Sequence, residues 1–117
     1  MLHHVSIETR PDDVEAELGF WALLGFERVD PPEALQDRAA WVERAGTQVH
    51  LLYAEQTVVP PQGHIAVVEE DWVRTVARLE GAGFEVEPRA QHWGVPRAYV
   101  HSPGGHLVEL MAAPPVS

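Results

Sequence analysis

The sequence contains one pattern of residues twice. His4-Val5-Ser6-Ile7 and His64-Ile65-Ala66-Val67 each join a histidine to strand-forming residues, and they start 64 − 4 = 60 residues apart. Each is followed by a helical pattern that closes with Gly-Phe-Glu, at Gly25-Phe26-Glu27 and at Gly83-Phe84-Glu85, an offset of 83 − 25 = 58 residues. A tandem repeat of this length predicts two copies of one supersecondary unit.

Each copy is expected to contain one amphipathic helix after its first strand. In the first copy, apolar residues recur at steps of three and four between Val14 and Leu24, and Asp12 and Glu15 would form a capping box. In the second copy, the same spacing links Trp72, Val76 and Leu79. The glycine of each Gly-Phe-Glu segment can end its helix in the left-handed conformation.

Each copy then closes with strands. The second strands, at about 26–29 and 84–87, are the weakest patterns. The hairpins run over 40–52, around Gly46, and over 98–110, through Ser102-Pro103-Gly104-Gly105. The sequence therefore predicts an α+β fold with about eight strands, in one domain over 1–117 made of two tandem βαβββ modules, 1–58 and 63–113.

Four side chains of metal-ligand type occupy repeat-related positions. Because side chains alternate across a strand, each copy has one candidate on its first strand and one on its last: His4 and His50, then His64 and Glu109. A single histidine on a strand is more often a surface or core residue than a metal ligand. The prediction of a metal site therefore rests on the four matched positions together. Three imidazoles and one carboxylate suit Zn, Ni, Mn, Co or Fe(II) better than Ca or Mg.

Other histidines are weighed against this set. His3 is the rival of His4, but His4 aligns with His64, and strand alternation predicts that His3 points to the opposite face. His106 lies in the last turn and is expected to be solvated. His101 shares a face with Tyr99 and with Arg97, so it is a candidate for lining a cavity.

Composition excludes several classes of function. There is no cysteine, which excludes disulfides, thiolate metal sites and thiol catalysis. The formal charge of −10 disfavours a nucleic-acid partner. No apolar run is long enough to cross a membrane, and no signal peptide is visible, so a cytoplasmic protein is expected.

These residues resemble the vicinal oxygen chelate superfamily, which includes glyoxalase I, extradiol dioxygenases, methylmalonyl-CoA epimerase, and fosfomycin- and bleomycin-resistance proteins. The most specific stretches are His4-Val5-Ser6-Ile7, Leu24-Gly25-Phe26 and 102–110, where Ser102 and Gly104 replace the two aspartates of the family's Asp-Pro-Asp-Gly pattern. The resemblance implies a cupped eight-stranded mixed sheet around a metal. It also implies that His4, His64 and Glu109 are ligands, with His50 in the position that often supplies a fourth.

The resemblance further implies a divalent-metal-dependent enzyme that binds a small oxygen-rich substrate through two of its oxygens. Lyase, isomerase or thiol-transferase chemistry is favoured, with Glu109 as a ligand that also moves a proton and Tyr99 as a substrate contact. The alternatives are an Fe(II) extradiol-type dioxygenase, in which His50 stays off the ion, and a small-molecule (antibiotic) binding or resistance protein. A homodimer is expected, with sites formed within one chain or between two.

Overall fold

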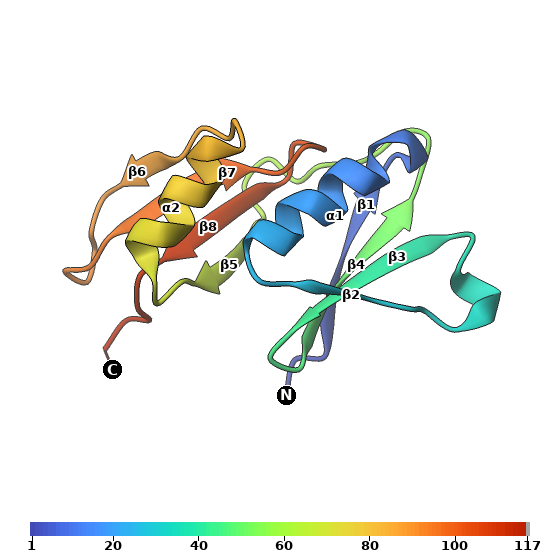
Figure 1. Ribbon diagram of the computed structural model, residues 1–117, viewed down its shortest axis with the longest axis horizontal. Coiled ribbons are helices and arrows are strands. Elements are labelled where there is room, and N and C mark those ends of the chain that lie inside the picture. The colour runs from blue at the N-terminus through green and yellow to red at the C-terminus, as the bar shows by residue number, and fades with distance from the viewer. Residues whose placement is uncertain (117) are drawn as a thin grey trace. The chain divides into compact units, whose positions relative to one another are not determined.

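The computed structural model describes residues 1–116, which form two compact units, one from Met1 to Val59 and the other beginning at Pro60. Both units have the same order of elements, a strand, a helix and three further strands (Figure 1). The predicted α+β fold of two βαβββ modules is therefore confirmed. Its eight strands form two separate four-stranded mixed sheets, one in each module.

The first module has its sheet in the order β1-β4-β3-β2. Strand β1 runs parallel to β4, whereas β3 is antiparallel to both β4 and β2. Two one-turn 3-10 helices, Pro11–Asp13 and Glu33–Leu35, interrupt the connections. The main elements are β1 (His4–Thr9), α1 (Val14–Leu23), β2 (Glu27–Val29), β3 (Ala39–Arg44) and β4 (Thr47–Tyr53).

The second module repeats this topology, with the order β5-β8-β7-β6 and a parallel β5–β8 pair. Its elements are β5 (Ile65–Val68), α2 (Trp72–Gly81), β6 (Glu87–Arg89), β7 (Arg97–His101) and β8 (Leu107–Met111). Both helices have ten residues, and no helix within residues 1–116 has the length and apolarity needed to cross a membrane.

Helix α1 ends as its Gly-Phe pair predicts. Gly25 has a φ of 84°, its N–H donates to the carbonyl of Ala22 at 3.0 Å, and the N–H of Phe26 donates to the carbonyl of Trp21 at 3.0 Å. These two hydrogen bonds define a Schellman motif. The apolar contact that accompanies such a motif is present, since the rings of Trp21 and Phe26 lie edge to face with centroids 5.2 Å apart.

Helix α2 ends in the same way, which displaces the strand predicted to follow it. Gly83 has a φ of 93°, and the N–H of Phe84 donates to the carbonyl of Leu79 at 3.0 Å. Phe84 therefore belongs to the helix end. Strand β6 begins at Glu87 and not at residue 84.

The predicted capping box at the start of α1 is wrong. Residues 11–13 form a 3-10 turn in which the N–H of Asp13 donates to the carbonyl of Arg10 at 2.9 Å. This turn makes Asp13, and not Asp12, the N-cap residue, and no side chain caps the helix.

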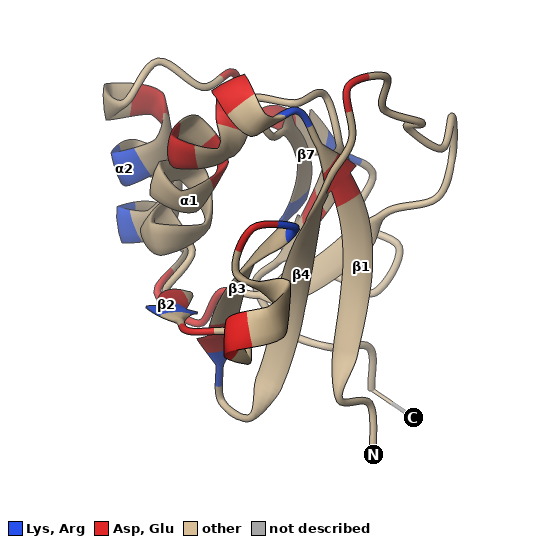
Figure 2. Ribbon diagram, turned by 90° about the vertical axis from the view of Figure 1, so that its right-hand side faces the viewer, with Lys and Arg blue, Asp and Glu red and all other residues tan. Residues whose placement is uncertain are grey.

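One face of each sheet packs against its helix, as Figure 2 shows for α1 beside β3 and β4. In the first module Trp21 is fully buried together with Val49 and Leu51 of β4. In the second module Leu79 is buried together with Val108 and Leu110 of β8. Alternate residues of β4 and β8 point toward the helices. His50 and Glu109 therefore lie on the faces of their sheets that point away from the helices.

Two glycines with open space around them should respond oppositely to alanine. Gly83 has a φ of 93°, where a Cβ is strained even in open space, so Gly83→Ala should lower the free energy of unfolding by about 1–2 kcal/mol. Gly19 lies inside α1, where an added Cβ would meet no atom within 4 Å, so Gly19→Ala should raise it by about 0.5–1 kcal/mol. Urea denaturation of both variants measures the two signs, and equal signs would contradict the assigned helix end.

Candidate metal centre

In the first module, the structure brings His4 and His50 together. Ser6 pairs with His50 and His4 with Gln48 across the parallel β1–β4 ladder, which places both imidazoles on the face away from α1. The two rings stack, with centroids 3.9 Å apart and an interplanar angle of 12°. Trp41 stacks on the His50 ring as well, at 3.9 Å and 3°.

Hydrogen bonds fix which nitrogen of His50 carries a lone pair. Gln48 donates from Nε2 to Glu43 at 3.0 Å, so its amide oxygen faces His50 and accepts a hydrogen bond from Nε2 of that ring at 2.7 Å. Burial, followed by the nearby charges of His4 and His3, lowers the pKa of His50 to about 4. His50 is therefore neutral near pH 7, and its Nδ1 has a lone pair available for a metal ion.

The prediction that His3 points away from His4 is wrong. The Nδ1 atoms of His3 and His4 lie 2.9 Å apart, and the rings meet edge to face with centroids 5.1 Å apart. The His3 ring also lies 6.2 Å from that of His50. His3 precedes the first residue of β1, so strand alternation does not determine its orientation. His3, His4 and His50 thus form one cluster whose ligand atoms all lie within 4.8 Å of one another.

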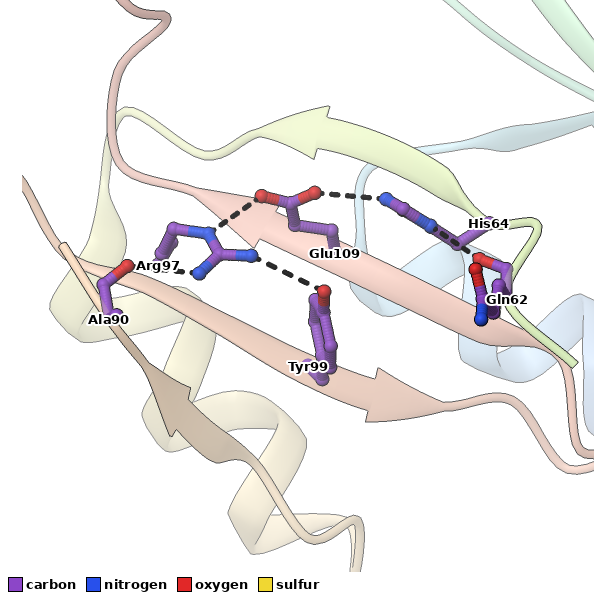
Figure 3. Close-up of polar contacts among 6 residues, drawn as sticks. All are labelled: Gln62, His64, Ala90, Arg97, Tyr99 and Glu109. Atoms are coloured by element: carbon purple, nitrogen blue, oxygen red, sulfur yellow. Dashed lines mark hydrogen bonds and ion pairs between the residues drawn. The ribbon is translucent and has the colours of Figure 1, made fainter. Parts of the chain in front are cut away.

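In the second module, Glu109 is the centre of a polar network (Figure 3). Its Oε1 lies 3.0 Å from Nε2 of His64, and its Oε2 accepts a hydrogen bond from Nε of Arg97 at 2.9 Å. Arg97 also donates to the hydroxyl of Tyr99 at 3.3 Å and to the carbonyl of Ala90 at 2.9 Å. Each carboxylate oxygen therefore has its own partner.

The ring of His64 lies between two oxygen acceptors. Its Nδ1 lies 2.9 Å from the carbonyl oxygen of Gln62, and its Nε2 faces Glu109, so both ring nitrogens face groups that can only accept. A divalent ion placed between Nε2 and the carboxylate would be held by an imidazole and a carboxylate, which are both common ligands of transition metals.

Charge balance keeps Glu109 ionised. Burial acts to raise the pKa of Glu109, but hydrogen bonds from Arg97 and His64 outweigh it and hold that pKa below its usual value. The hydrogen bond to Glu109 in turn raises the pKa of Arg97. Glu109 is consequently a carboxylate at neutral pH, which is the form that binds metals.

Strand register explains this network and shows how it could have been predicted more fully. Glu109 lies opposite Tyr99 on β7 and opposite Ala66 on β5. Arg97 lies two residues before Tyr99, on the same face of β7. Diagonal neighbours across an antiparallel pair are within reach of a long side chain. The alternation pattern predicts that Arg97 shares a face with Tyr99, but the contact with Glu109 requires this diagonal reach in addition.

Three other histidines, His92, His101 and His106, lie outside both groups. His101 ends β7 and is exposed. The expectation that His106 is solvated is wrong. This residue is buried, and its backbone is bonded to Ser102: its N–H donates to the hydroxyl of Ser102 at 3.1 Å, and its carbonyl accepts from the N–H of Ser102 at 2.9 Å. These bonds close the last turn over His106.

The fold and these side chains agree with one family. Residues 2–110 match the Glyoxalase/Bleomycin resistance protein/Dioxygenase superfamily, and the chain belongs to it. Among characterised proteins it is similar to "Glyoxylase I 4" of Arabidopsis thaliana, with 28% identity over 121 residues, which cover 93% of this chain and 68% of that protein.

Solved structures share the fold at lower sequence identity. A Bacillus anthracis protein assigned to the glyoxalase family superimposes with a TM-score of 0.84 at 23% identity, over 95% of this chain and 93% of its own. A fosfomycin resistance protein from Listeria monocytogenes superimposes with a TM-score of 0.78 at 19% identity, over 97% and 91% of the two chains. At these identities the likeness establishes the fold alone.

Proposed function

We propose that this chain is a divalent-metal-dependent enzyme that binds a small oxygen-rich substrate through two of its oxygens. His4 and His50 from one module, together with His64 and Glu109 from the other, would hold one ion. The observation that carries the proposal is the pair formed by His64 and Glu109, in which Nδ1 of the imidazole faces the carbonyl of Gln62 and Nε2 is directed at the carboxylate. Within the cluster of His3, His4 and His50, the rings of His4 and His50 would supply the complementary donors.

The chemistry of the donors defines the ion. A neutral His50 and an ionised Glu109 are both in their metal-binding forms. Imidazoles with one carboxylate fit Zn, Ni, Mn, Co or Fe(II). When bound, such an ion polarises substrate oxygens and stabilises negative charge that develops on them.

The protein's own groups suggest how a substrate would be handled. Arg97 and Tyr99 lie beside Glu109, so a guanidinium and a phenol hydroxyl are available to hold a polar substrate. Proton transfer by Glu109 requires its hydrogen bonds to loosen, because the partners that keep it ionised also make it a weaker base. We therefore assign Glu109 first as a ligand, with lyase, isomerase or thiol-transferase chemistry as the reaction class.

One observation favours a second candidate, an Fe(II) extradiol-type dioxygenase. His50 is held between the rings of Trp41 and His4, and its Nε2 is bonded to Gln48. Stacked rings cannot both direct a lone pair at one ion, so if the stack persists with His4 on the metal, the ligands are two histidines and one carboxylate, the set that non-haem Fe(II) oxygenases use. Oxygen consumption with catechol by the Fe(II)-loaded chain, and its absence with Zn, would select this candidate.

A bidentate oxygen ligand tests the proposal without knowledge of the substrate. Acetohydroxamate should bind the Co(II)-loaded chain and change the visible absorption of the ion, since both of its oxygens would enter open positions on the metal. The metal-free chain should not bind it at the same concentration. An unchanged Co(II) spectrum at saturating acetohydroxamate would contradict bidentate chelation. Binding of small aromatic drugs without any metal would favour a sequestering protein instead.

The proposal includes a homodimer as the working assembly. The donor pairs of the two modules would come together within one chain or between two chains of the dimer. Sedimentation of the purified protein measures the mass. Mixing His4→Ala chains with Glu109→Ala chains then separates the arrangements, because only sites built between chains would be restored in mixed dimers.

A further inference from the structure

We propose that the first module contains a tri-histidine metal site of its own, formed by His3, His4 and His50, which binds a transition metal without help from the second module. All three residues lie in the unit from Met1 to Val59. Their ligand atoms lie within 4.8 Å of one another. The site shares His4 and His50 with the proposed catalytic centre, but His3 belongs to it alone.

The spacing between His3 and His4 fits coordination of one ion. With a metal–nitrogen distance of about 2.1 Å, two nitrogens in adjacent octahedral positions are about 3.0 Å apart, and in tetrahedral positions about 3.4 Å. The two Nδ1 atoms are separated by 2.9 Å. Two nitrogens at this distance share a hydrogen, so both rings already bring a ring nitrogen to the same small region, where an ion could replace the hydrogen after the rings turn toward it.

His50 is the most firmly held member of the cluster. Gln48, itself bonded to Glu43, accepts a hydrogen bond from Nε2 of His50 and leaves Nδ1 with the lone pair. An N–H that is fixed by a neighbouring acceptor is the usual support for a metal-bound histidine. Trp41 covers one face of the His50 ring, which limits its rotation.

Coordination requires one movement. Parallel rings cannot both direct a nitrogen lone pair at the same ion, so the His4 ring must turn out of its stack with His50. His4 and His3 are exposed, and their rotation displaces solvent and not packed side chains. The movement breaks one ring stack. The free energy of that stack is small compared with the free energy of three metal–nitrogen bonds.

The chemistry of this site differs from that of the proposed catalytic centre. Its three donors are all imidazoles, so it is selective for borderline ions such as Co(II) and Zn(II) and should ignore Mg(II) and Ca(II). The two sites share His4 and His50, so they cannot be filled together. The tri-histidine site would therefore be filled only when His64 and Glu109 do not bind the ion.

Co(II) titration of the full-length chain, without an added histidine tag, tests this site. The background variant is His64→Ala/Glu109→Gln, which removes the donors of the second module while the glutamine still accepts a hydrogen bond from Arg97. This variant should bind one Co(II) per chain. Adding His3→Ala should weaken binding at least about 10-fold, as expected for loss of one of three ligands. Adding His101→Ala, an exposed histidine on β7, should leave binding unchanged.

The outcomes separate this site from the proposed function. A folded background variant that binds no Co(II), or that binds equally well with and without His3, overturns the tri-histidine site. If the wild-type chain binds Co(II) no more tightly than the background, the proposed catalytic centre fails and the tri-histidine site stands. Should circular dichroism show the background variant unfolded, His64→Ala alone serves in its place, because it keeps the Arg97–Glu109 pair.

Discussion

Glu109→Gln should weaken binding of Zn(II) or Co(II) about 100-fold or more. This loss of affinity is larger than the loss expected when a residue that only orients a metal ligand is removed. The amide has nearly the shape of the carboxylate but no charge, and its oxygen is a weaker donor. Arg97 makes the effect greater. Its positive charge, balanced by Glu109 at 2.9 Å in the wild type, would face the ion without compensation.

Glu87→Gln is the matched control for this experiment. Glu87 lies on β6 opposite Tyr99, two strands away from Glu109, and it is exposed. The same loss of one negative charge there should change the affinity by less than about 2-fold, because an exposed charge outside the ligand set is screened by solvent. Equal effects of the two substitutions would show that overall charge, and not Glu109 as a ligand, determines binding.

Trp21→Ala should lower the free energy of unfolding by about 3–5 kcal/mol, and Leu79→Ala by about 2–5 kcal/mol. Both side chains are 0% exposed, and they hold equivalent positions at the ends of α1 and α2, since 79 − 21 = 58. Trp21 loses additional contacts, namely the ring of Phe26 and a hydrogen bond from its Nε1 to Glu17 at 3.2 Å.

Val73→Ala provides the comparison, because Val73 is on α2 but 80% exposed. It should change the free energy of unfolding by no more than about 0.5 kcal/mol. Calorimetric or urea unfolding measures all three variants. A loss below about 1 kcal/mol for Trp21→Ala or Leu79→Ala, well under the usual range for buried side chains, would show that the helix of that module does not pack on its sheet as described.

The repeat predicted most of the fold because each copy carries the same physical signals. Local residue preferences determine the helix ends at Gly25 and Gly83. The alternation of side chains determines the hairpin register and the inward faces of β4 and β8. The failures came where a neighbouring bond overrode a local pattern. Phe84 is held by the end of α2, which delays β6, and the 3-10 turn before α1 displaces the predicted cap.

The candidate site was predicted less completely than the fold. The pairing of His4 with His50 and of His64 with Glu109 follows from strand positions, and the structure shows both pairs in contact. The position of His3 did not follow, because it precedes the strand and its ring is placed by His4. Arg97 was missed as a partner of Glu109 because the contact is diagonal across two strands, and side-chain reach decides it as much as register does.

Metal content at equilibrium tests the central claim most directly. The claim is that one divalent ion per chain is bound by donors from both modules. The tag-free chain, dialysed against low micromolar Zn(II) or Co(II) and measured by elemental analysis, should contain one ion per chain. His4→Ala should contain much less under the same conditions, and His64→Ala, which keeps the tri-histidine site, should fill only at a higher concentration of free metal. A wild-type chain with no bound metal, or a His64→Ala variant that fills at the same free metal concentration as the wild type, would contradict the account.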